Sequence, residues 1–209
     1  MLIVNLLWLT FNIPIVFLLI SLFLAKNMNE VIAIGMILWI IIPFLFFPAT
    51  TSMFAIMRHY LLKKEHMRII PSFLKFYKEN YIRSMTGGII IGSMWLIAIV
   101  DYYIFTAQSV YVKYPFFIIF IGLFVYTLYF ISGTVHFEAK LFTSLRNTLF
   151  ITLSHPILNF GLGILMIFVI YGSFNYFTII SPLFIGSLIA LTSFSVFYKI
   201  FLTSNPNHL

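Results

Sequence analysis

Residues 147–198 read NTLFITLSHPILNFGLGILMIFVIYGSFNYFTIISPLFIGSLIALTSFSVFY and contain no Asp, Glu, Lys or Arg. As one α-helix this run would measure about 78 Å, whereas the hydrocarbon core of a bilayer is about 30 Å thick. The run therefore has to fold back on itself, and the turn-forming stretch 171–176 (YGSFNY) is where we expect this. It predicts two membrane-spanning helices, roughly 151–171 and 178–198, and a start at Ile157, after His155 and Pro156, is the alternative for the first of them.

The composition of the whole chain agrees with a membrane protein. Of its 209 residues, 62% are hydrophobic, 20% are aromatic and 8% are charged, against about 25% charged in an ordinary soluble domain. A soluble fold would lack the charged surface it needs. The absence of Cys excludes disulfides, thiolate catalysis, iron–sulfur clusters and cysteine-based zinc sites. We expect an all-α membrane protein with one polytopic domain, 1–209.

Charged residues divide the rest of the chain into four more uncharged runs that are long enough to cross a bilayer. The expected spans are roughly 2–25, 31–57, 84–106 and 114–135, which makes about six transmembrane helices in all. The first run has no cationic segment before it and no small-residue cleavage site near Ala25. We therefore interpret it as a retained span and not as a signal peptide.

The basic residues predict an orientation. The chain has 12 Lys and Arg and 5 Asp and Glu, a net charge of +7. With the N-terminus inside, the inner segments 58–83, 136–147 and 199–209 hold every basic residue except Lys26 and Lys113. This bias predicts that both termini are cytoplasmic. The charge is then explained by orientation and by anionic lipid headgroups, with no need for nucleic acid as a partner.

Segment 58–83 is expected to be a cytoplasmic loop that contains an interfacial helix. Pro71 suits the first turn of a helix, and over 71–83 an aromatic face opposes a charged face at helical spacing. We expect this helix to lie on the anionic inner leaflet, and segment 139–153 to form a second amphipathic helix. The candidate contacts with lipid or with a partner protein are Arg58, Lys63, Lys64, Lys75, Lys78 and Arg83.

Two prolines, Pro43 and Pro48, interrupt the second expected span, and Thr50 and Thr51 follow them. Each proline removes an intrahelical hydrogen bond. We therefore expect a broken or strongly kinked helix whose freed carbonyls accept hydrogen bonds from these hydroxyls. Such a helix frames the substrate site in many secondary transporters. The alternative is a kink that only shapes packing.

Asn12 and Pro14 lie near the middle of the first expected span. An amide inside a bilayer is costly without a partner, so Asn12 should face another helix, as a structural clasp or else as a ligand contact. We expect regions 12–14 and 43–50 to be neighbours. The candidate bundle-interior or ligand-facing residues are thus Asn12, Pro14, Pro43, Pro48, Thr50 and Thr51.

Small and aromatic residues predict contacts between helices. Gly88 and Gly92 form a GxxxG motif, which lets two helices approach closely. We interpret it as packing within the chain, with a homodimer seam as the alternative. Tyr126 and Tyr129 lie inside the fourth span, where we expect their hydroxyls to bond to neighbouring helices. Lining a cavity is the alternative role.

The sequence contains no motif that indicates a proton relay, a zinc enzyme or a nucleotide hydrolase. All five acidic residues map to span ends or loops, which argues against a proton relay at the midplane. The stretch 136–138 lacks the His-Glu-x-x-His spacing of a zinc site, and no phosphate-binding Gly-x-x-x-x-Gly-Lys sequence occurs. We expect a non-enzymatic protein with no catalytic residues, no metal site and no cofactor.

Four stretches in order resemble the YesL-like family of bacterial membrane proteins, which is defined by a domain of unknown function. They are NLLW (5–8) leading to NIP (12–14), FPAT (47–50), FLKFYKENY (73–81) and LRNTL (145–149). The family pattern has a longer lead than the four residues that precede Asn5 here. The resemblance implies a protein of the bacterial cytoplasmic membrane whose genes often lie beside genes for carbohydrate uptake and polysaccharide degradation. It implies no reaction and no catalytic residue.

Two functions are therefore expected as alternatives. The first is an accessory or partner component of a carbohydrate transporter complex, with the basic loop 58–83 as its docking surface. The second is a small secondary transporter for a neutral solute or saccharide.

Overall fold

The computed structural model describes residues 1–62, 67–107, 109–176 and 183–204, and these residues form α-helices with no strand. The helices are α1 (Leu2–Phe11), α2 (Ile13–Phe23), α3 (Met28–Leu61), α4 (Ile69–Thr106), α5 (Lys113–His136), α6 (Leu141–Ser154), α7 (Pro156–Tyr176) and α8 (Ile185–Ser204), with the short 3-10 helix η1 (Val110–Val112) before α5. The chain is an all-α membrane protein, as its composition predicts.

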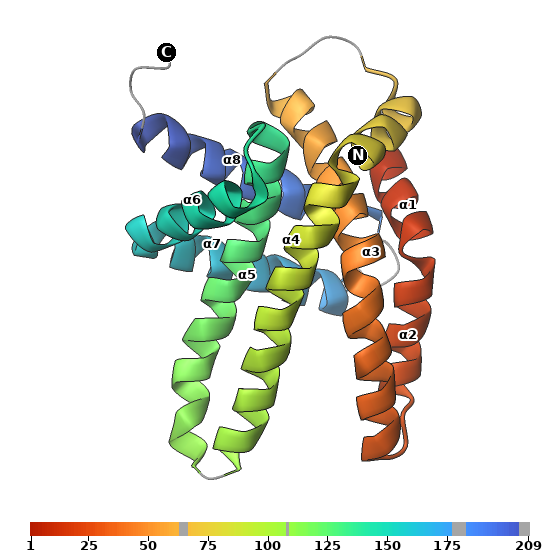
Figure 1. The fold of residues 1–209 in the computed structure, drawn as a ribbon, viewed down its shortest axis with the longest axis vertical. Helices are drawn as coiled ribbons and strands as arrows, with labels where there is room; N and C mark the ends of the chain where they lie inside the picture. Colours follow the sequence, from red (N-terminus) through yellow and green to blue (C-terminus); the bar gives the residue numbers. More distant parts are fainter. Residues whose placement is uncertain (63–66, 108, 177–182, 205–209) are drawn as a thin grey trace.

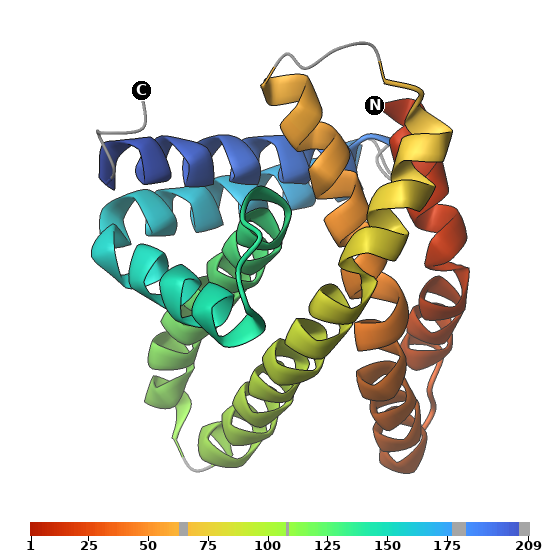
Figure 2. The same ribbon diagram turned by 45° about the horizontal axis from the view of Figure 1, so that its top comes forward.

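Five of these helices, α3, α4, α5, α7 and α8, are long and apolar enough to cross a membrane. The pair α1 and α2 is a sixth candidate, bent by 70° at the break between the two helices. This agrees with the expected number of about six. The helices differ in direction, however (Figures 1 and 2): α1 to α5 follow the long axis, whereas α6, α7 and α8 lie across it, in the half that holds the N-terminus.

The expected interfacial helix is not a separate element. Residues 71–83 form the first part of α4, which continues through the third expected span as one helix of 38 residues. Its length of about 57 Å exceeds the hydrocarbon core, so one part of α4 has to extend beyond it. The reason is local: Pro71 lies in the first turn, where proline is tolerated, and the next proline or glycine is Gly87.

The fifth span starts close to the later of its two expected positions. Residues 151–154 belong to α6, and the chain breaks at His155, whose φ of −127° and ψ of 62° are not helical. Pro156 then begins α7. Since a proline suits the first position of a helix and disfavours a helical residue before it, the His-Pro pair sets this boundary.

We expected the second span to be broken or strongly kinked, and the break is wrong. α3 runs through Pro43 and Pro48 as one helix of 34 residues. The chain breaks in the first span instead, at Asn12, which separates α1 from α2. Pro14 lies in the first turn of α2, where its missing N–H costs no hydrogen bond. The first span is therefore the discontinuous one: it is interrupted at Asn12, and Pro14 lies just after the interruption.

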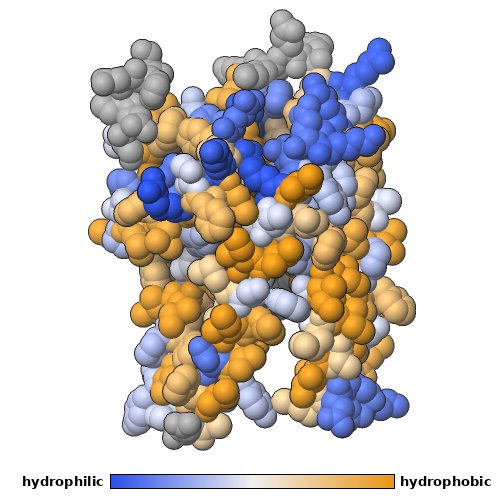
Figure 3. Space-filling model, in the orientation of Figure 1, coloured by the Kyte–Doolittle hydropathy of each residue, from blue (hydrophilic) through white to orange (hydrophobic). Residues whose placement is uncertain are grey.

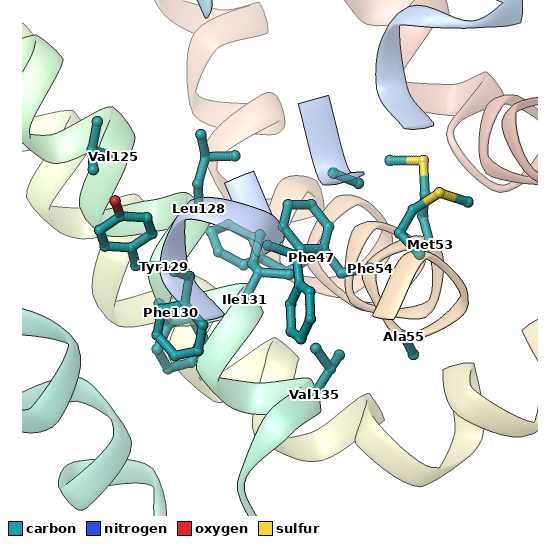
Figure 4. Packing of buried hydrophobic residues seen from close by; sticks show 14 of the residues in the cluster. Phe47, Met53, Phe54, Ala55, Val125, Leu128, Tyr129, Phe130, Ile131 and Val135 are labelled. Atoms are coloured by element: carbon teal, nitrogen blue, oxygen red, sulfur yellow. The ribbon is translucent and has the colours of Figure 1, made fainter. Parts of the chain in front are cut away.

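The core lies in the half of the molecule where α6, α7 and α8 cross the other helices. Every residue of α3 from Phe47 to Met57 is buried, which fits a helix enclosed on all sides. Aromatic and aliphatic side chains of α3 and α5 interdigitate there, among them Phe54, Tyr129 and Phe130 (Figure 4). Towards the opposite end the α2–α3 and α4–α5 pairs separate, and apolar side chains face outward (Figure 3).

Polar side chains gather at two ends of the molecule, most of them at the end with the N-terminus (Figure 3). That end carries the last turn of α3, with Arg58, and the first turns of α4, with Lys75 and Lys78, and Arg68 lies just before α4. The opposite end carries the connections from α2 to α3 and from α4 to α5, with the four charges Lys26, Glu30, Asp101 and Lys113. The structure thus groups the basic segments as expected, and their cytoplasmic orientation stays a prediction.

Candidate functional site

Three hydrogen-bonded pairs of residues link four helices inside the core. One pair joins α8 to α1, one joins α1 to α3, and one joins α3 to α4. We call this set the polar seam, and it consists of Asn5, Trp8, Thr50, Thr51, Ser84 and Ser187. Apart from the half-buried Trp8, every member is at least 95% buried.

Asn5 joins the two ends of the chain. Its Nδ2 donates to Ser187 Oγ at 2.7 Å, and its Oδ1 accepts from the Ser187 backbone N–H at 3.0 Å. The first N–H groups of a helix lack partners within the helix, so Asn5 acts as a cap for α8 that is supplied by α1. A Cβ atom on the neighbouring Gly186 would lie 2.7 Å from Asn5 Oδ1, which shows how closely the two helices approach.

Two consecutive threonines of α3 accept hydrogen bonds from two different helices. Trp8 Nε1 donates to Thr50 Oγ1 at 3.0 Å, and Ser84 Oγ donates to Thr51 Oγ1 at 2.9 Å. Thr50 and Thr51 are 5% and 0% exposed, which agrees with their expected place in the interior. We expected their hydroxyls to donate to the carbonyls that the prolines leave without an N–H partner, and this is wrong. Thr51 Oγ1 donates to the Phe47 carbonyl, which is not one of them. Pro43 and Pro48 themselves are buried.

Asn12 lies at the break between α1 and α2 and is 1% exposed. Its Nδ2 donates to the Trp8 carbonyl at 2.7 Å, while its buried Oδ1 has no hydrogen-bond partner in the part of the chain that the structure describes. Pro14 is exposed, so its expected place in the interior is wrong. The expected contact between the two proline regions is made one turn earlier, by Trp8 with Thr50 and Phe46.

The two glycines of the GxxxG motif differ in their surroundings. A Cβ on Gly88 would lie 2.7 Å from the Phe47 ring, so this glycine accommodates an aromatic side chain of α3. Gly87 does the same for Phe130 of α5. Gly92 has nothing within 4 Å of such a Cβ. Gly88 therefore takes part in helix packing within the chain, and Gly92 does not.

The residues that we expected to contact lipid or a partner protein differ in their exposure. Lys75 and Lys78 are exposed, and Lys75 Nζ lies 3.8 Å from Glu79 Oε1 on the next turn. Arg58 is half-buried, and Lys63 and Lys64 lie outside the described residues. These positions leave the exposed face of α4 free for a lipid surface or a protein.

Arg83 has a role inside the fold that its sequence position did not predict. Its guanidinium donates to the carbonyl of Thr134, to that of Phe137 at 2.8 Å and to that of Ala139 at 3.1 Å. These carbonyls lie at the C-terminal end of α5 and just after it, where a cation is favoured by the helix dipole. Arg83 therefore caps α5 and is not a free surface contact.

The tyrosines of α5 bond to neighbouring helices, as expected. Tyr129 Oη donates to Asn159 Oδ1 at 2.7 Å, and Tyr126 Oη donates to the Leu145 carbonyl at 3.3 Å. Asn159 Nδ2 in turn donates to the Thr152 carbonyl at 2.6 Å. These bonds hold α6 and α7 against α5.

The polar seam offers amide and hydroxyl groups but no ionisable side chain. Such groups can hold helices in register or bind a neutral polar ligand. Among the described residues no three His, Cys, Asp or Glu side chains are placed to hold a metal ion. The spacing of Asn5, Trp8 and Asn12 puts them on one helical face, and this signal could have predicted the α1 part of the seam.

Residues 1–102 match the family described as a protein of unknown function, DUF624. The DUF624 region covers α1, α2 and α3 and most of α4, and thus all of the seam except Ser187. No curated protein and no solved structure matches the chain.

Proposed function

We propose that this protein is a non-enzymatic component of the bacterial cytoplasmic membrane that assembles with a carbohydrate uptake system. The resemblance to the YesL-like family supports the association with carbohydrate uptake. The observation that carries the proposal is the exposed charged face of α4, with Lys75 and Lys78, together with the exposed Arg68 just before the helix, at the end of the molecule where most polar side chains gather.

The extra length of α4 supports a docking role for this face. A helix of 38 residues is longer than a membrane crossing requires. Phe73 is fully buried in this part of α4, and Tyr77 packs against Phe11 of α1 with 4.7 Å between the ring centroids. The aromatic side thus fixes the helix to the bundle, which leaves the charged side for a partner.

Co-purification from native membranes in mild detergent tests this proposal. We expect wild type to bring down subunits of a carbohydrate transporter, and the double variant Lys75→Glu/Lys78→Glu to lose them. The matched control is Lys26→Glu/Lys113→Glu, which makes the same charge change at the opposite end and should keep the partner. Recovery of wild type alone, or equal loss in both double variants, would contradict the proposal.

A second candidate function is transport of a neutral solute or saccharide by this chain itself. The observation that favours it is the broken first span, where the buried Asn12 Oδ1 has no partner among the described residues. Transporters use such interruptions to expose polar backbone and side-chain groups to a substrate. Uptake of labelled saccharides into vesicles that contain only this protein would support it, provided that Asn12→Leu abolishes uptake and the exposed Thr10→Val does not.

A further inference from the structure

Two half-buried arginines at the same end of the molecule differ in their partners. Arg83 donates to three carbonyls at the end of α5. Arg58, in the last turn of α3, has a buried Nε with no hydrogen-bond partner, and no ion pair involves it within the described part of the chain. A guanidinium keeps its charge, and a buried N–H donor without an acceptor is unfavourable. Among the described residues Arg58 therefore has no acceptor comparable to those of Arg83.

The described groups around Arg58 do not supply this acceptor. Arg58 is close enough to Tyr198 of α8 for an electrostatic interaction. The Tyr198 ring is stacked on Phe194 with 6.0 Å between centroids, and it lies 5.4 Å from the ring of His136. The next residue, His59, is bonded through Nδ1 to the Ala55 carbonyl and packs against Phe76. The surroundings in the described structure are thus aromatic rings and a phenol, with no carboxylate bonded to Arg58.

We propose that Arg58, at the junction of α3 and α8, binds the phosphate group of an anionic membrane lipid. The planar fork of a guanidinium matches two phosphate oxygens, which makes arginine the usual residue for bidentate phosphate contacts. Arg58 lies in the last turn of α3, which is long and apolar enough to cross a membrane, and the ends of such helices meet the lipid headgroups. This inference does not depend on the partner proposed above.

Two further observations favour a lipid as the source of the phosphate. Exposed cations at the same end, Arg68 and Lys199, add to the field that concentrates anionic headgroups. Tyr60, two residues after Arg58, is 51% exposed and suits the membrane interface. A free phosphate offers the same chemistry at Arg58, but it has no acyl chains to cover the apolar surface of the helices.

The test measures the thermal stability of the full chain in detergent, with phosphatidylglycerol or inorganic phosphate added. We expect phosphatidylglycerol to raise Tm and inorganic phosphate at the same concentration to leave it nearly unchanged. Arg58→Gln should bind phosphatidylglycerol about tenfold more weakly. Arg68→Gln, which removes an exposed charge at the same end, should bind it within about twofold of wild type.

Each other outcome has a defined meaning. An equal rise with inorganic phosphate would overturn the assignment to a lipid. Equal weakening in Arg58→Gln and Arg68→Gln would overturn the site, since binding would then follow net charge alone. If Arg58→Gln does not fold, Arg58→Lys replaces it, because a lysine keeps the charge but loses the bidentate fork. Absence of any Tm rise in wild type would overturn the proposal without reference to a variant.

Discussion

At the scale of single residues, buried amides and hydroxyls decide which helices touch. In a bilayer an apolar helix surface gains little by leaving lipid tails for another helix. Close packing and hydrogen bonds therefore determine which helices associate. Asn5 is the clearest case, because its two bonds to Ser187 join positions that are 182 residues apart. The residues on either side of it, 1–4 and 6–9, are apolar, so the amide indicates that a partner exists but not which residue it is.

Replacement of Asn5 by Leu should lower the stability of the protein. It leaves the Ser187 backbone N–H and hydroxyl without their α1 partner, at a cost of about 1–3 kcal/mol. The measurement is Tm of the purified protein in detergent. Thr10→Val is the matched control, because the Thr10 hydroxyl is exposed and bonds only to a carbonyl of its own helix; a similar drop in both variants would argue against a special role for Asn5.

Alanine should affect the stability of the protein differently at the two glycines of the GxxxG motif. Gly88→Ala places a methyl group 2.7 Å from the Phe47 ring and should cost about 1–3 kcal/mol through overpacking. Gly92→Ala meets nothing within 4 Å and should be neutral or stabilising by up to about 1 kcal/mol, since alanine is the better helix former. Tm in detergent decides, and equal destabilisation would indicate that Gly92 lies in an interface with another chain.

At the scale of elements, helix ends are held by side chains from other helices. Asn5 of α1 caps the start of α8, and Arg83 of α4 caps the end of α5. Proline decides where a helix begins: Pro14, Pro71 and Pro156 each lie in a first turn, where no hydrogen bond is lost. Pro43 and Pro48 lie inside α3 and do not break it; Pro48 belongs to the part of the helix that the core encloses, and Pro43 lies just before that part.

Loss of the Arg83 cap should loosen the end of α5. Arg83→Met keeps much of the side-chain volume but leaves the carbonyls of Thr134, Phe137 and Ala139 without their donor. We expect faster amide hydrogen exchange over residues 134–144, with little change in α2, because the effect is local. The exposed Lys78→Met serves as the control and should leave exchange in this region unchanged.

At the scale of the whole molecule, charge separates the two ends. Basic segments that are distant in sequence lie at the end with the N-terminus, while Lys26, Glu30, Asp101 and Lys113 lie at the other end. The net positive end is expected to face the cytoplasm, because basic residues are retained on that side of the membrane.

Single-cysteine labelling checks this orientation. The chain has no Cys, so each substitution introduces one thiol. In intact cells a membrane-impermeant maleimide should label Lys26→Cys, and it should label Lys78→Cys only after the cells are permeabilised. The reverse pattern would place the basic end outside.

The sequence by itself determined the all-α membrane class and the approximate number of candidate spans, because both follow from local hydropathy. It also determined the grouping of charge, because this follows from how many times the chain crosses the membrane. It also indicated that Tyr126, Tyr129, Thr50 and Thr51 would be buried. Only the tertiary structure decided that the first span breaks at Asn12 while α3 stays whole, that Arg83 caps α5, and that α7 and α8 lie across the other helices. These features depend on which helices meet, since a proline or a buried polar group is accommodated by its neighbours in space. A pattern along the chain does not contain those neighbours.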